Sequence, residues 1–521
     1  MADELRRFLT NTALSRRSLL RTIGWGGGAW AGGVLLRGGV LPVMAAEPTG
    51  HSNVTPGSPI AAYTLRAERK EVAPAGTPVP AILLNGNMPG PELRVKEGEL
   101  FRVQLQNALP DTPTTIHWHG LLVPAAMDGV PGISQDPVAP GQVFVYEYPI
   151  RQTGTYWYHS HYGFQEQIGC SGALIIEPRH ESLKYDHDVV LFISDWLNSN
   201  PEAIIPTLRQ EAEKMGGMKM GGPGGSGDKA GMKTEGPDPR PTMGQNKGSM
   251  QMGGGPDLAD VKYSAFLLNG KANGNPWTCK ARPGQRIRFR IINGSGSTFF
   301  RFMIDSHSLL ITHADGEAVR PLEVDNLLLG TAECYDVLVT AGASGAYTIR
   351  AEAQDGSGAA LGVLHTPDAQ VAMNPGPPKW GARQLSYAQL QAVRPTTLPE
   401  GPLNSFKLVL GGNMGKYIWN INDQYYPQAD PLLIQEGQRV QVEIFNNTDM
   451  FHPMHLHGHF FRLLSRTGED PLAPLKHTVS VAPKATVKFE FAADNPGRWF
   501  FHCHNLYHLE TGMARQWQYK I

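Results

Sequence analysis

The chain has 521 residues, which is too long for a single hydrophobic core and predicts several domains. Its 46 basic and 47 acidic side chains nearly balance, so its charge gives no reason to expect nucleic acid as a partner. The 59 glycines and 41 prolines favour a turn-rich β protein, and four cysteines are too few for a disulfide-stabilised scaffold.

Residues 1–46 are expected to be an export signal. Residues 15–20 resemble a twin-arginine motif, a weakly apolar stretch follows to about Leu36, and residues 43–46 offer small side chains for cleavage. The alternative is a membrane anchor. Arg37 and the seven glycines between Thr22 and Gly39 make this region a poor membrane span. We therefore predict a periplasmic protein that uses the twin-arginine route and has no stable membrane anchor.

A short pattern recurs three times and indicates the number of folded domains. After an asparagine-containing turn (Asn85, Asn269 and Asn422), a glycine leads into a strand with alternating apolar residues that closes on an asparagine. The three spans are Gly98–Asn107, Gly284–Asn293 and Gly437–Asn446. This repetition predicts three copies of one β fold. We expect domains at residues 55–180, 185–368 and 403–521, with a proline-rich linker at 369–402.

Eight of the 18 histidines occur in four His-x-His pairs. The pairs are His117 and His119, His159 and His161, His455 and His457, and His502 and His504. Because side chains alternate along a strand, both imidazoles of a pair can point the same way. Imidazole suits copper, and eight imidazoles can satisfy three copper ions with positions left for a small ligand. The pairs fall only in the first and third domains, so we expect this cluster at their interface, with the second domain as a spacer.

Cys503 lies between His502 and His504 and should point to the opposite face of the strand. With His508, Met513 and an upstream histidine, for which His452 is the obvious candidate, it completes the ligand set of a blue copper site. The two predicted metal sites are therefore joined through adjacent residues.

The second domain contains a Gly/Met/Lys-rich insertion at residues 210–257. Seven of the 17 methionines lie in it, namely Met215, Met218, Met220, Met232, Met243, Met250 and Met252. The composition predicts a mobile loop. Thioethers favour Cu(I), which suggests copper capture, whereas the alternative is a flexible insertion with incidental methionines. Cys279 and Cys334 also lie in this domain, and the sequence leaves open whether they pair.

The four histidine motifs resemble those of the multicopper oxidases. The motifs His-x-His-Gly, His-x-His, His-Pro-x-His-x-His-Gly and His-Cys-His-x3-His-x4-Met occur in the family order, and the resemblance covers about residues 55–521. Residues 117–169, which include Glu166 and Gln167, look most like the CopA-type copper-resistance members. The resemblance implies an all-β protein of three cupredoxin-like Greek-key β-sandwich domains. Copper-resistance members carry comparable Met-rich segments.

The resemblance also implies four copper ions with assigned ligands. The type 1 ligands would be His452, Cys503, His508 and axial Met513. The type 2 ligands would be His117 and His455, and the two type 3 ions would take His119, His159 and His504, and His161, His457 and His502. Asp128 matches an acid that members place near the cluster, although a plain Asp-Gly turn explains it equally well. Many members carry an acid directly after the type 1 histidine; here that position is Leu509, and Glu510, the candidate proton donor, is one step further on.

Such an enzyme would take electrons singly from a reductant and pass four to O2, giving water. Cu(I), Fe(II) and phenols are plausible reductants, and the Met-rich insertion favours Cu(I) oxidation in copper tolerance. One alternative is a general laccase or ferroxidase. Another, of a different class, is a periplasmic copper-sequestering protein. Whether the insertion covers the type 1 site is left open by the sequence, because its anchoring points are far from the third domain along the chain.

Overall fold

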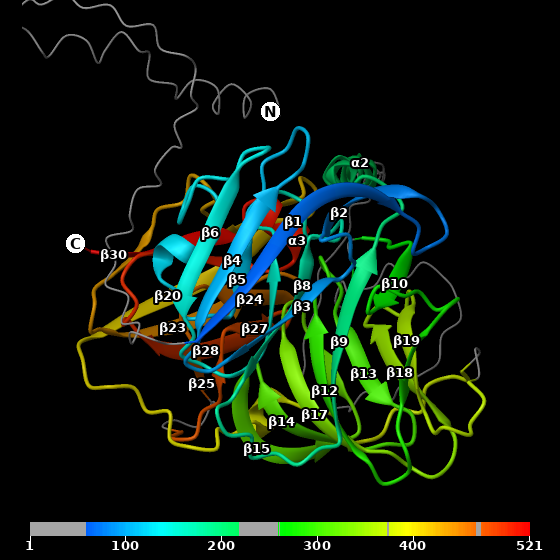
Figure 1. Cartoon of the computed structure of the whole chain (residues 1–521). Coiled ribbons are helices and arrows are strands. Elements are labelled where there is room, and N and C mark those ends of the chain that lie inside the picture. Colours follow the sequence, from blue (N-terminus) through cyan, green and yellow to red (C-terminus); the bar gives the residue numbers. More distant parts are fainter. Residues whose placement is uncertain (1–58, 218–258, 260, 372–374, 465–469, 521) are drawn as a thin grey trace, which may run out of the picture. The chain divides into compact units, whose positions relative to one another are not determined.

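A computed structural model describes residues 59–217, 259, 261–371, 375–464 and 470–520. Nearly all of the regular structure there is β-strand, arranged in six sheets (Figure 1). The described helices are α2 (Ile204–Gly217) and α3 (Leu506–Glu510), with short 3-10 turns η1 (Ala125–Met127), η2 (Pro201–Ala203) and η3 (Tyr387–Gln389). None of the described helices is long and apolar enough to span a bilayer. The predicted export signal and residues 218–257 of the Met-rich insertion lie outside the described residues.

The first domain is built from two four-stranded sheets. One has the order β2 (Val79–Leu84), β1 (Ile60–Val72), β4 (Leu100–Asn107), β6 (Val143–Pro149). The other has the order β3 (Gly90–Lys96), β8 (Ser171–Glu177), β7 (Gly154–His159), β5 (His117–His119). The edge strand β5 thus carries the first histidine pair.

The second domain is built from a six-stranded and a five-stranded sheet. The first has the order β10 (Ala265–Leu268), β9 (His187–Trp196), β12 (Arg286–Asn293), β17 (Cys334–Thr340), β14 (Leu309–Ala314), β15 (Glu317–Val324). The second has the order β11 (Trp277–Lys280), β19 (Ala359–His365), β18 (Ala346–Ala353), β13 (Phe300–Ile304), β16 (Leu327–Leu329). Cys279 and Cys334 lie in different sheets and in separate hydrophobic clusters, and both are free thiols, so the disulfide that the sequence left open is not formed.

The third domain repeats the six-plus-five arrangement. Its larger sheet has the order β21 (Ile418–Ile421), β20 (Leu403–Asn413), β23 (Arg439–Asn446), β28 (Thr486–Ala492), β25 (Phe461–Leu464), β26 (Leu475–Lys476). Its smaller sheet has the order β22 (Leu432–Ile434), β30 (Ala514–Tyr519), β29 (Arg498–Cys503), β24 (His452–Leu456), β27 (Thr478–Val481). The central strands β29 and β24 of this smaller sheet carry histidines of the predicted metal sites.

The repeated sequence pattern corresponds to the same strand in each domain. Strands β4, β12 and β23 each end at the closing asparagine and pair in parallel with the first strand of their domain, β1, β9 and β20. The closing side chains are buried and donate from Nδ2 to carbonyl oxygens of segments more than 30 residues away: Asn107 to Val138 (2.8 Å), Asn293 to Leu329 (3.0 Å) and Asn446 to Val481 (3.0 Å). A buried amide with these partners ties each repeat strand to its own sandwich. The predicted fold class is confirmed; the bounds that we assign to the domains stay a prediction.

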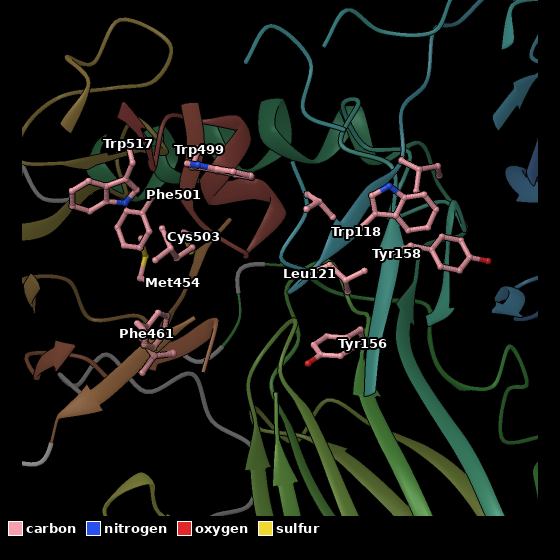
Figure 2. Packing of buried hydrophobic residues seen from close by; sticks show 14 of the residues in the cluster. Trp118, Leu121, Tyr156, Tyr158, Met454, Phe461, Trp499, Phe501, Cys503 and Trp517 are labelled. Atoms are coloured by element: carbon pink, nitrogen blue, oxygen red, sulfur yellow. The ribbon is translucent and has the colours of Figure 1, made fainter. Parts of the chain in front are cut away.

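The hydrophobic cores explain how the metal-site strands are held. One continuous cluster contains buried residues of both the first and the third domain, whereas the main core of the second domain is a separate cluster. Figure 2 shows residues of the shared cluster, with Trp118 and Tyr158 on one side and Phe501 and Trp517 on the other. Because buried apolar area stabilises packing, this shared cluster holds the histidine-bearing strands of the two domains together.

Candidate metal centres

His452, Cys503 and His508 form a buried cluster in the third domain. Their ligand atoms lie within 4.8 Å of one another. The two histidine Nδ1 atoms are 3.1 Å apart, and each lies 3.6 Å from Cys503 Sγ. Burial lowers the pKa of His452 well below its usual value, and the nearby His508 lowers it further, so this imidazole is a neutral donor. Two imidazoles and a thiolate aimed at one point suit copper.

The local sequence accounts for this arrangement. Strand β29 ends at Cys503, which lies opposite Met454 of β24. Asn505 then caps α3, because its side-chain oxygen accepts from the backbone N–H groups of Tyr507 (3.1 Å) and His508 (3.3 Å). This single helical turn brings His508 back to Cys503. Backbone bonds from Met513 N to His508 O and from Cys503 N to Met513 O, both 3.0 Å, hold the buried Met513 beside the cluster.

The eight histidines of the four pairs come together where the first and third domains meet. His117 of β5 lies opposite His159 of β7, and His455 of β24 lies opposite His502 of β29. The ligand atoms form groups within 4.8 Å, which are His119, His159 and His504; His161, His457 and His502; and His117, His455 and His457. Each group takes residues from both domains. The eight histidines therefore lie at the interface of the first and third domains, as the sequence predicts.

The chemistry of these side chains fits metal ions. Burial lowers the pKa well below its usual value for His119, His159, His161, His455, His457, His502 and His504. Among the described residues, the buried Nε2 atoms without a hydrogen-bond partner include those of His117, His159, His161, His455 and His504. Buried polar atoms are normally satisfied. A copper ion would satisfy these nitrogens, because neutral imidazole offers it a lone pair.

Asp128 adjoins this cluster. Its Oδ2 lies 2.9 Å from His457 Nδ1 and its Oδ1 lies 3.2 Å from His117 Nδ1, with no exposed surface. The alternative of an Asp-Gly turn also agrees with the structure. Gly129 has a φ of +82°, and a Cβ at this position would lie 1.8 Å from Ile116 O, so only glycine fits. The structure thus contains both features that the sequence allowed.

Two glutamates border the cluster on another side. Glu166 Oε2 lies 2.7 Å from His159 Nδ1, and burial, with Asp195 nearby, raises the pKa of Glu166 well above its usual value. Glu510 and Glu166 line one narrow pocket with four of the predicted ligands. Glu510 keeps exposed surface. Desolvation by the surrounding protein, together with the negative charge of Glu202, nevertheless raises its pKa to about 7. Sequence reasoning gave Glu166 no role, and the only signal was its place in a stretch similar to CopA-type proteins.

His477 is a further buried histidine that the sequence did not single out. Its carbonyl oxygen accepts from His455 Nδ1 (2.8 Å), and its ring nitrogen groups with those of His119 and His455. The preceding Lys476 has no exposed surface and lies 3.0 Å from both Asp315 and Glu333 of the second domain. The second domain therefore does more than separate the other two, because its acids hold the segment that orients His455. Because His477 belongs to no His-x-His pair, the sequence gives no indication that its segment orients His455.

Comparison with known proteins agrees with this geometry. Family models described as multicopper oxidase match residues 66–181, 187–369 and 402–521, which together span most of the chain. The chain belongs to the multicopper oxidase family. Members are oxidoreductases that use O2, contain copper and take reductants such as Cu(I), Fe(II) or phenols. The predictions of family, fold and enzyme class are confirmed.

Three known proteins illustrate the range of this similarity. Copper resistance protein A of Pseudomonas syringae pv. tomato is 31% identical, over 84% of this chain and 89% of that protein. Multicopper oxidase MmcO of Mycobacterium tuberculosis is 34% identical, over 85% of this chain and 84% of that protein. The crystal structure of a laccase from Botrytis aclada matches with a TM-score of 0.72 and 25% identity, covering 89% of this multicopper oxidase and 88% of the laccase.

Proposed function

We propose that this multicopper oxidase holds four copper ions in the two clusters. His452, Cys503, His508 and Met513 would hold the blue type 1 ion. The type 2 ion takes His117 and His455. One type 3 ion takes His119, His159 and His504, and the other takes His161, His457 and His502. Support comes from the grouped ligand atoms, their burial and their unpartnered nitrogens.

The copper ions, when bound, would accept electrons singly from a reductant and supply four of them to O2, giving water. The protein's own residues would connect the two sites and supply them with protons. Cys503 is the direct chain neighbour of His502 and His504, so one peptide unit on each side joins the clusters. We assign Asp128 and Glu510 as proton donors. Asp128 hydrogen-bonds His457, and Glu510 lines the pocket bordered by His161 and His502.

We propose Cu(I) as the reductant and copper tolerance as the physiological role. The observation that carries this proposal is the position of α2. Arg209 of α2 donates to Lys416 O (3.2 Å), and close by Trp419 packs with its ring centroid 4.1 Å from that of His508. The Met-rich insertion, which starts at residue 210, therefore begins beside the segment that packs on a type 1 ligand. Soft thioethers there would bring Cu(I) to the place where electrons enter.

Replacing the seven methionines of the insertion with leucine should weaken Cu(I) oxidation. We expect the KM for Cu(I) to rise several-fold with kcat less affected, because capture contributes uniform binding. Deleting residues 210–257 should have the same effect. Both variants should keep their copper, since the insertion supplies none of the proposed ligands. The measurement is O2 consumption with Cu(I), Fe(II) and a bulky phenol, using one copper-loaded preparation of each variant.

The comparison of reductants separates the competing functions. Phenol turnover should stay level or rise in both variants, and the leucine variant controls for the length of the insertion. Unchanged Cu(I) kinetics in both variants would favour a general laccase or ferroxidase. Cu(I) binding without any O2 consumption by the wild type would instead indicate a copper-sequestering protein.

We also propose export to the periplasm by the twin-arginine route. The basis is the sequence of residues 1–46, with its paired arginines and its small residues before position 47. This route carries folded cargo, which suits a protein whose metal sites lie between two domains.

A further inference from the structure

Two buried carboxyl groups stand in similar positions on different sides of the histidine cluster. Asp128 faces Nδ1 of His117, from the first domain, and Nδ1 of His457, from the third. Glu166 likewise faces Nδ1 of His159 and Nδ1 of His504, one from each domain. The distances to Glu166 are 2.7 Å from Oε2 to His159 and 4.0 Å from Oε1 to His504. Each carboxyl group thus adjoins histidines that belong to different domains.

We infer that Glu166 is a positioning residue that fixes the orientation of His159 and His504 and so holds one type 3 copper. This inference rests on the proposed ligand assignment. A histidine that gives its Nδ1–H to a carboxyl oxygen keeps its Nε2 lone pair for a metal, and such partners fix both the tautomer and the ring orientation. His159, at 2.7 Å, is within hydrogen-bond distance of Glu166, whereas His504, at 4.0 Å, is within the longer range of an ion pair. The geometry agrees, because the Nε2 atoms of both His159 and His504 are buried and have no hydrogen-bond partner in the described structure.

The surroundings of Glu166 leave it available for this role. It is 5% exposed, and its Oε1 has no hydrogen-bond partner among the described residues, so His504 is the complementary group that this atom faces. The carbonyl oxygen of Ser160 is a second acceptor for His159 Nδ1, at 3.1 Å, so a backbone group and the Glu166 carboxyl group both adjoin this nitrogen.

The test compares Glu166→Ala and Glu166→Gln with a matched control, Asp195→Asn. Asp195 is a carboxylate of similar burial that touches no proposed ligand; it accepts from Gly296 N, Thr298 Oγ1 and Gln167 Nε2. Each protein is loaded with copper and dialysed against a mild chelator. Copper per chain, the blue absorption and the electron paramagnetic resonance (EPR) spectrum are then measured. A close pair of Cu(II) ions is spin-coupled and silent, whereas a single remaining ion gives a signal.

Glu166→Ala should retain type 3 copper about 10- to 100-fold less tightly and show a new Cu(II) signal, while the blue colour stays. Glu166→Gln, which keeps one acceptor oxygen but turns an amide N–H toward the other ring, should fall between alanine and wild type. This near-isosteric variant answers the question if the alanine variant fails to fold. Asp195→Asn should keep the silent pair.

Three outcomes would overturn the inference. One is a silent pair held at wild-type affinity in both Glu166 variants. Another is an equal loss of copper in Asp195→Asn, which would indicate a general effect of altering a buried carboxyl group. The third is a wild-type protein without any silent pair, which alone would also refute the proposed ligand assignment.

Discussion

Replacing Cys503 with serine should abolish the blue colour of the copper-loaded protein and reduce its oxidase turnover to that of the copper-free protein. Cys503 Sγ is the only soft anionic donor in the cluster with His452 and His508. A serine hydroxyl provides neither the thiolate nor its charge-transfer absorption. The loss should extend to every reductant, because all electrons would enter through this site. Visible absorption, copper per chain and O2 consumption measure the three effects.

Cys279→Ser is the matched control for this substitution. Cys279 is also buried, but it lies on β11 of the second domain and belongs to no ligand group in the described structure. Colour and turnover should both remain. The histidine cluster of Cys503→Ser should still bind copper, since it keeps all eight imidazoles. A blue, active Cys503→Ser protein would refute the type 1 assignment.

Replacing Lys476 with methionine should destabilise the protein by about 3–5 kcal/mol. Lys476 and its partners Asp315 and Glu333 are fully or almost fully buried, and each carboxylate oxygen lies 3.0 Å from the ammonium. Removing the cation leaves two buried carboxylates without their charge partner. Asp315 also accepts from the backbone N–H groups of His477 and Thr478, so the segment beside His455 should loosen. Urea unfolding of the two proteins measures the difference.

The exposed ion pair of Lys488 with Glu443 is the control, because a pair of 2.7 Å at the surface contributes little. Lys488→Met should change the free energy of unfolding by less than about 1 kcal/mol. An equally small effect of Lys476→Met would show that the buried network does not stabilise the interface between the second and third domains.

The same network predicts a dependence on pH. Burial alone would raise the pKa of Asp315, but the adjacent Lys476 ammonium outweighs it and holds that pKa below its usual value. A carboxyl group with a lowered pKa in the folded state stabilises the protein above its unfolded pKa, and this contribution is lost as the pH falls through the folded value. The difference in stability between wild type and Lys476→Met should therefore shrink below a pH of about 3.9, the ordinary value for aspartate.

Local sequence patterns were enough to predict much of this molecule. The alternation of side chains along a strand placed both imidazoles of each pair on one face, and the structure brings all four pairs together. The recurring glycine-to-asparagine spacing predicted three copies of one fold. The reason is that each closing asparagine makes the same kind of buried hydrogen bond in its own copy. These features depend on residues close together in the chain, which is why they can be read from the sequence.

Contacts between distant segments could not be predicted in this way. Glu166 contacts His504 only after the first and third domains have packed, and Lys476 meets Asp315 across 161 positions of the chain. The position of α2 beside residue 416 likewise depends on how the second domain docks on the third. The capped helical turn at Asn505 was not predicted, although an asparagine before a short apolar run is a recognisable helix start.

The central claim is that one chain holds a blue copper site and a separate cluster of three copper ions. The most direct measurement is copper per chain in the mature wild-type protein, taken together with its visible and EPR spectra. The account predicts four copper ions, an intense blue colour and a spin-coupled pair that leaves only two ions detectable by EPR. A colourless protein with full copper occupancy would contradict the type 1 site, and a blue protein with a single copper per chain would contradict the histidine cluster.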